Sequence, residues 1–228
     1  GFHNKVWQWE ELPDGIRFSL YSPDGEGGFP GNIRVITDYR FNEDNELSVR
    51  HYAETDCATY INMTNHAYFN LCGKGKKITE HRLHIPADRI LDTTPAFIPT
   101  GKRMNVKNTP FDFTSLKPIG TDLYADHEQL LWNKGYNHCY ILKDEISVEM
   151  LEAASLYEPV TGRNMTVMTD LPAVLLYTAG YYERPDTAVC LETQFYPDTP
   201  SHSDFPSCLV LPEKAYEHCT LFHFQVQK

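Results

Sequence analysis

The chain contains 228 residues, and its 20 Lys and Arg against 31 Asp and Glu give a formal net charge of −11. This acidic balance argues against nucleic acid as a partner, because binding phosphates requires a basic face. No apolar run approaches the ~20 residues of a membrane helix, so we expect no membrane partner. A hydrophobic content of 41% with 22% charged residues fits a folded globular protein.

Apolar residues alternate with polar ones along most of the chain, which predicts strands. A strand-like run at 5–10 is followed by one at 16–21, which lies between two Pro-Asp-Gly turns. Residues 33–41 and 47–53 flank a polar turn and predict a hairpin. Further strands are predicted at residues 81–85, 139–142, 148–157, 165–168, 173–178, 189–195 and 216–226.

The best helical candidate is short and covers residues 122–132. Many strands joined by turns, without intervening helices, predict an all-β antiparallel sandwich or barrel. With no repeat and no Gly-, Ser- or Pro-rich linker, we expect a single domain over residues 1–228. Because Gly1 is followed almost directly by a strand-like run, we expect this domain to be incomplete at its N-terminus.

The six cysteines are widely spaced, and no two form a Cys-x-x-Cys pair. We therefore expect reduced, partly buried thiols, no metal site and a cytoplasmic location. The oligomeric state is not indicated by the sequence.

A first polar cluster lies in residues 61–71, where three Asn and a Thr surround His66. Asn is a poor strand former, and a local rule broken between strands often marks function. His66 could donate or accept a proton near neutral pH. The alternative is a polar turn with one hydrogen-bonded histidine.

A second candidate is Glu192, within the run at 188–198. Alternation places Glu192 on a face of small and semi-polar residues, opposite the apolar face of Leu191 and Phe195. Partial desolvation there would raise the carboxyl pKa and make a better base. The alternative is an exposed glutamate on a solvated strand.

A third cluster, residues 135–138, contains His138, which could hold a substrate hydroxyl or cap a turn. The chain contains no phosphate-binding Gly loop, no Gly-x-Ser-x-Gly elbow and no dinucleotide fingerprint.

Taken together, these segments resemble the aldose 1-epimerase (galactose mutarotase) family. The similarity runs in order through Trp7 and the segments 28–32, 64–71, 98–101, 109–113, 135–138, 158–163, 191–198, 205–207 and 211–212. The resemblance implies a large antiparallel β-supersandwich. It also implies an isomerase that interconverts the α and β anomers of a free aldohexose such as galactose or glucose, without a cofactor or metal.

In this resemblance Glu192 corresponds to the general base and His66 to the general acid. The residues implied to bind the monosaccharide are Asn65, Asn137, His138, Tyr177 and Gln194.

The chain also departs from the family pattern. An Asp that binds substrate in the family corresponds to Asn137, and a Gln in the strand before Tyr177 corresponds to Leu175. The family also has an Arg and a second His upstream of the position of Gly1. These departures leave open a carbohydrate-binding protein without catalysis. An inverting glycosidase ranks below both, because Glu192 has no evident acidic partner.

Overall fold

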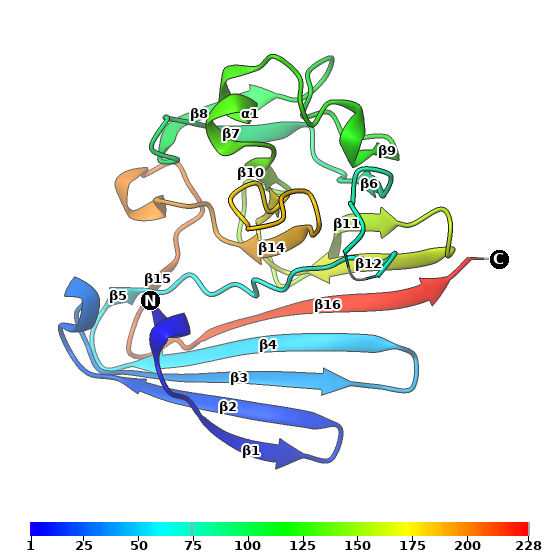
Figure 1. Cartoon of the computed structure of the whole chain (residues 1–228). Coiled ribbons are helices and arrows are strands. Elements are labelled where there is room, and N and C mark those ends of the chain that lie inside the picture. Colours follow the sequence, from blue (N-terminus) through cyan, green and yellow to red (C-terminus); the bar gives the residue numbers. More distant parts are fainter. Residues whose placement is uncertain (74, 228) are drawn as a thin grey trace.

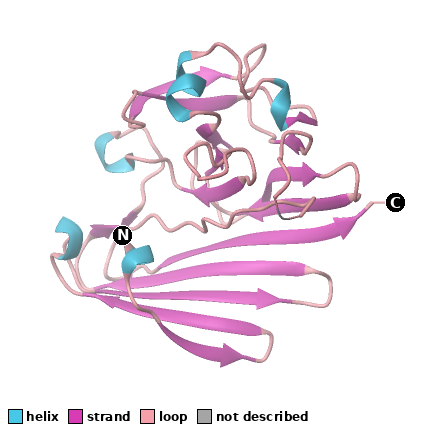
Figure 2. Ribbon diagram, in the orientation of Figure 1, coloured by secondary structure: helices cyan, strands magenta, loops and turns pink. Residues whose placement is uncertain are grey.

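The computed structural model describes residues 1–73 and 75–227 and consists mainly of antiparallel strands. Figures 1 and 2 show long strands in a broad sheet, with shorter strands, loops and short helices packed on one side of it. Within the described residues, we find no helix with the length and apolar character needed to span a membrane.

The larger sheet has nine strands in the order β1-β2-β3-β4-β16-β12-β11-β6-β9. All the pairings within it are antiparallel, as expected from the alternating pattern of the sequence. In chain order its strands are β1 (Gln8–Leu12), β2 (Gly15–Ser22), β3 (Ile33–Phe41), β4 (Glu46–Thr55), β6 (Arg82–His84), β9 (Lys117–Pro118), β11 (Leu151–Tyr157), β12 (Arg163–Thr169) and β16 (Tyr216–Val226).

The smaller sheet has five strands in the order β14-β13-β10-β7-β8, and β15 pairs separately with β5. These strands are β5 (Thr59–Tyr60), β7 (Arg89–Thr93), β8 (Pro99–Asn105), β10 (Asn137–Ile141), β13 (Ala173–Tyr177), β14 (Cys190–Gln194) and β15 (Leu209–Val210). The helical elements are α1 (Glu128–Asn133) and the 3-10 turns η1 (Phe2–Asn4), η2 (Glu26–Gly28), η3 (Ile119–Thr121) and η4 (Thr199–Ser201).

One apolar core joins the two sheets. Val167 of β12 and Phe222 of β16 belong to the same buried cluster as Val174 and Leu176 of β13 and Leu191 of β14. Because side chains alternate across a strand, the residues between these core positions face away from the core. The smaller sheet therefore has a second face, on which Cys190 and Glu192 lie.

The predicted strands agree well with these elements. The hairpin is confirmed by the pairing of β3 with β4, and the last strand occupies the predicted residues 216–226. The antiparallel all-β fold class is likewise confirmed.

Three predicted elements begin at least three residues too early. The strand predicted at 5–10 is β1, which covers Gln8–Leu12. The strand predicted from 148 starts at Leu151, because Val148 is 92% exposed and the pairing with β12 begins only at Leu151. The helix predicted from residue 122 starts at Glu128, where the His127 ring accepts a hydrogen bond from the Gln129 amide and caps the first turn.

Candidate active site

The fold brings His66 and Glu192 together although 126 positions separate them in sequence. His66 Nε2 lies 3.5 Å from Glu192 Oε1. Glu192 belongs to the edge strand β14, while His66 lies in the irregular segment after β5. An isolated antiparallel bridge between Phe69 and Val189, with two backbone hydrogen bonds of 2.9 Å, fastens this segment beside the start of β14. Phe69 lies three residues after His66, and Val189 lies three residues before Glu192. The bridge therefore holds the His66 and Glu192 side chains close together.

The Glu192 carboxyl is buried, with 8% of its side chain exposed. Burial raises its pKa from 4.5 to about 7, since the charged form loses hydration. The predicted desolvation of Glu192 is therefore confirmed, and the exposed-glutamate alternative is excluded. By contrast, 49% of the His66 side chain is exposed, so its ring borders open space.

A cavity of about 330 Å³ adjoins the pair. This volume lies at the lower end of the ~300–1,000 Å³ range of small-molecule sites. Aromatic rings form much of its wall, and the Tyr68 ring lies 5.0 Å from the His66 ring and 6.4 Å from the Tyr177 ring. The lining residues are His66, Tyr68, Phe97, Asn137, Leu175, Tyr177, Tyr181 and Glu192.

Two of the five predicted sugar contacts, Asn137 and Tyr177, line this cavity. Asn65 instead has a local structural role. Its amide nitrogen donates to the Tyr39 hydroxyl at 2.7 Å, and its oxygen accepts from the Ala67 amide at 3.1 Å. Gln194 shares the Glu192 face of β14 but is outside the cavity lining.

His138 is placed elsewhere, which corrects its prediction as a sugar contact. In β10 it alternates with Asn137, so it faces the core while Asn137 faces the cavity. Its side chain is fully buried, its ring lies 4.5 Å from the Phe111 ring, and its Nδ1 accepts a hydrogen bond from the Asn137 amide at 3.0 Å. Burial lowers the pKa of His138 to about 3, so it is a neutral core residue near pH 7.

Three aromatic residues of the cavity, Tyr68, Phe97 and Tyr181, were missed by the sequence reasoning. Phe97 and Tyr181 come from different loops, yet their rings lie 6.1 Å apart. The sequence feature that could have indicated them is the pair of tyrosines just after β13. In the structure Tyr181 and Tyr182 are each more than half exposed. Exposed aromatic rings beside a strand end are typical of a binding surface.

A larger hollow of about 1620 Å³ also borders His66. Its lining is mainly apolar and includes residues of the larger sheet such as Phe18, Ile33 and Tyr39. His66 and Tyr68 border both spaces, whereas Glu192 borders the smaller one alone. The two side chains of the pair therefore meet only at the smaller cavity.

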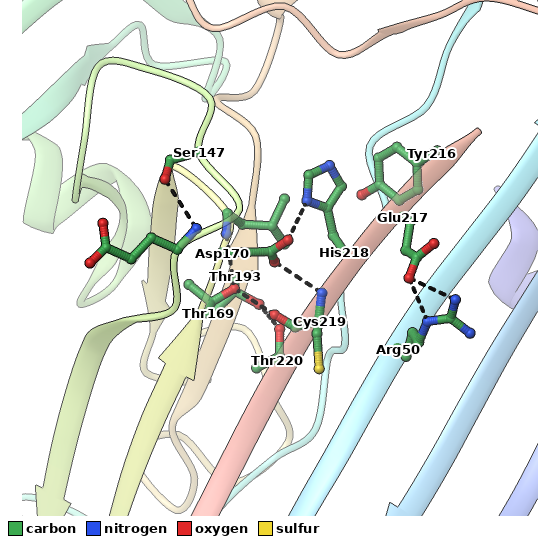
Figure 3. Close-up of polar contacts among 12 residues, drawn as sticks. Arg50, Ser147, Thr169, Asp170, Thr193, Tyr216, Glu217, His218, Cys219 and Thr220 are labelled. Carbon is green, nitrogen blue, oxygen red and sulfur yellow. Dashed lines mark hydrogen bonds and ion pairs between the residues drawn. The ribbon is translucent and has the colours of Figure 1, made fainter. Parts of the chain in front are cut away.

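The strand that carries Glu192 is tied to the larger sheet through its opposite face. The Thr193 hydroxyl is hydrogen bonded to the Thr220 hydroxyl of β16 (Figure 3). Beside this contact, Asp170 accepts from the Cys219 amide at 2.9 Å and lies 2.9 Å from the His218 ring. The Thr193–Thr220 contact therefore helps to fix the position of β14 and of Glu192, while the Asp170 contacts join the segment before β13 to β16.

Cys190 lies beside the pair, on the same face of β14 as Glu192. Its Sγ is 3.5 Å from His66 Nδ1, on the opposite side of the ring from the carboxylate contact. Burial raises the pKa of the Cys190 thiol, so it is protonated near neutral pH. All six cysteines are free in this structure.

Comparison with known proteins identifies the family to which the chain belongs. The family model described as "Aldose 1-epimerase" matches residues 1–223. The chain is 34% identical to galactose mutarotase from Rattus norvegicus, over 99% of this chain and 67% of that protein. It is 32% identical to aldose 1-epimerase from Escherichia coli K12, over 98% of this chain and 68% of that protein.

Solved structures show the same fold. Galactose 1-epimerase from Lactobacillus acidophilus superposes with a TM-score of 0.85 at 26% identity, over 98% of this chain and 68% of that chain. An aldose epimerase homologue from C. elegans gives a TM-score of 0.85 at 24% identity, over 98% and 70% of the two chains. With a family match over almost its whole length and relatives above 30% identity, the chain belongs to the aldose 1-epimerase family.

Proposed function

We propose that this protein interconverts the α and β anomers of a free aldohexose, galactose or glucose, by acid/base-catalysed ring opening and closure. The observation that carries the proposal is the 3.5 Å approach of His66 to the buried Glu192 at the wall of a sugar-sized cavity. Family membership supports the same reaction.

In the proposed mechanism, ionised Glu192 takes the proton of the anomeric hydroxyl. Protonated His66 gives a proton to the ring oxygen while the bond between C1 and that oxygen breaks. The product is an open-chain aldehyde, with Glu192 protonated and His66 neutral. After rotation about the C1–C2 bond, closure reverses both transfers and can deliver the other anomer. The reaction is redox-neutral, and each positioned acid or base typically contributes ~10²–10⁴-fold.

The raised pKa of Glu192 suits the role of base. An ordinary glutamate with a pKa of 4.5 is a weak base, whereas burial here raises the value to about 7. A general base transfers protons best when its pKa lies near the working pH, and a pKa of about 7 meets this condition near neutral pH. The same desolvation also strengthens its attraction to a protonated His66 at 3.5 Å.

The cavity wall is suited to a pyranose. The aromatic rings of Tyr68, Tyr177 and Tyr181 offer apolar faces for the C–H surfaces of the sugar, and Asn137 offers an amide for a hydroxyl. We propose Asn137 and Tyr177 as the substrate contacts among the residues identified from the sequence.

The free state of all six cysteines supports the further proposal of a cytoplasmic location. Two of the thiols, Cys139 and Cys208, lie in apolar core clusters, where they act as small apolar side chains.

Polarimetry of freshly dissolved α-D-galactose and α-D-glucose tests the proposal. The protein should speed the approach to the equilibrium rotation well above the rate in buffer alone, for at least one of the two sugars. Calorimetric binding of both sugars without faster exchange would instead indicate a carbohydrate-binding protein of the same fold, and would contradict the proposal.

A further inference from the structure

We infer that His66, Cys190 and Glu192 form a binding site for a thiophilic divalent cation such as Zn²⁺, and that the bound ion blocks the proton-transfer pair. The inference goes beyond the proposed function. Ion binding itself does not depend on mutarotation, whereas the inhibition that follows from it does.

The geometry of the cluster is close to that of a three-residue metal site. One candidate ligand atom from each residue can be chosen so that all three lie within 4.8 Å of one another. In a tetrahedral zinc site, bonds of 2.0–2.3 Å place neighbouring ligand atoms about 3.5 Å apart. The observed separations of His66 Nδ1 from the Cys190 sulfur and of His66 Nε2 from the Glu192 oxygen are both 3.5 Å.

Small side-chain movements would complete the site. Because the two contacts of His66 use different ring nitrogens, a single ion requires the ring to turn so that one nitrogen faces both partners. The His66 side chain is 49% exposed, which leaves room for this turn. Cys190 and Glu192 are two positions apart in β14 and point to the same face, so the strand already presents their donor atoms together.

The donor atoms favour zinc over magnesium or calcium. Imidazole and thiolate are ligands of Zn²⁺ and related ions, whereas Mg²⁺ and Ca²⁺ prefer oxygen alone. On binding, the Cys190 thiol releases its proton to solvent, and the thiolate and the Glu192 carboxylate together balance the two charges of the ion. No Lys or Arg belongs to the described lining of the smaller cavity, so no fixed cation opposes entry.

Three protein ligands leave one tetrahedral position open towards the cavity, where a water molecule fits. In this state the Glu192 carboxylate and the bound His66 nitrogen no longer exchange protons with a sugar. Zn²⁺ should therefore inhibit in competition with the sugar, and removal of the ion by a chelator should restore activity.

Direct binding is measured first, with Zn²⁺ by calorimetry and with Co²⁺ by absorption spectroscopy on the full chain. We expect one ion per chain and a thiolate-to-Co²⁺ charge-transfer band. In Cys190→Ser the band should vanish and the affinity for Zn²⁺ should fall by at least about tenfold, as expected for loss of a metal contact. The matched control is Cys57→Ser, which removes an exposed thiol that lines neither cavity and should keep both signals.

A charge-transfer band that survives in Cys190→Ser would overturn the inference, as would the absence of binding by the parent. If Cys190→Ser does not fold, Cys190→Ala with a circular dichroism check replaces it. Inhibition is then measured in each variant as the ratio of its anomer-exchange rates with and without Zn²⁺. Binding without any mutarotation in the metal-free protein would contradict the proposed function and leave the metal site standing.

Discussion

Leu175 of β13 lies directly opposite Glu192 of β14 in the antiparallel pairing of the two strands. Both residues also line the smaller cavity. An apolar side chain therefore occupies the neighbouring position from which an amide could have hydrogen bonded the carboxylate. This arrangement is consistent with burial as the cause of the raised pKa of Glu192.

Replacing Leu175 with Gln should shift the pH dependence of catalysis. An amide donor stabilises the ionised carboxylate by about 1.5–3 kcal/mol, which lowers its pKa by about one to two units. In the parent, the rate should fall as the pH drops below about 7, because Glu192 takes up a proton. In Leu175→Gln this fall should begin at a lower pH.

The matched control is Leu175→Met, which keeps an apolar side chain of similar volume. Its pH–rate profile should coincide with that of the parent. A profile that is unchanged in Leu175→Gln would show that Glu192 does not control the acidic limb.

Glu192→Gln should stabilise the fold at alkaline pH. Below about pH 4.5 the carboxyl is protonated in both the folded and the unfolded chain. As the pH rises from 4.5 to about 7, the folded chain retains a proton that the unfolded chain has released, so stability is lost. The full cost is about 3 kcal/mol, and a glutamine does not incur it.

Urea unfolding of parent and variant at pH 8 and at pH 4.5 measures this difference. The variant should be more stable at pH 8, and most of its advantage should disappear at pH 4.5. Equal stability of the two proteins at pH 8 would mean that the carboxyl is less desolvated than the structure indicates.

Much of the fold follows from the sequence alone, since alternation is a local property. Residues 216–226 form one strand as predicted, and the apolar face of Leu191 and Phe195 lies in buried clusters. The pairing of His66 with Glu192 came from resemblance, because no local pattern joins segments more than a hundred residues apart. The partial burial of the strand face around Glu192 could nevertheless be predicted from the residues next to it in the sequence.

The recognition side chains were harder to predict. Alternation alone would have separated Asn137 from His138, because adjacent strand residues face opposite sides. Tyr68, Phe97 and Tyr181 come from irregular segments, whose side-chain directions depend on tertiary packing. Sequence periodicity carries no information about such loops.

The corrected role of His138 gives a prediction of its own. His138→Gln keeps a hydrogen-bond acceptor beside the Asn137 amide and removes no cavity residue, so the KM for sugar should stay within about threefold of the parent. Asn137→Ala removes the amide from the cavity wall, and loss of one hydrogen bond to the sugar should raise KM by about five- to tenfold. Steady-state polarimetry of the two variants compares adjacent residues on opposite faces of β10. A larger effect on KM in His138→Gln than in Asn137→Ala would restore His138 as a sugar contact.

The contributions of the Thr193 and Thr220 hydroxyls to the free energy of unfolding should depend on each other. Thr193→Val leaves the buried Thr220 hydroxyl without this partner and should cost about 1–3 kcal/mol. Because replacing both partners by apolar groups of the same shape is nearly neutral, Thr193→Val/Thr220→Val should recover most of that loss.

Chemical denaturation of the single and double variants measures the coupling. Additive losses in the double variant would show that the two hydroxyls do not depend on each other.

The most direct test of the account is the anomer-exchange rate of Glu192→Gln, measured by NMR magnetisation transfer between the two anomeric protons of the sugar. Gln keeps the size of the side chain and the strand pairing but cannot take up the anomeric proton. We expect a rate at least about 10²-fold below that of the parent, since one positioned base is lost, while the sugar still binds. An exchange rate equal to that of the parent would contradict the role of Glu192 as the base.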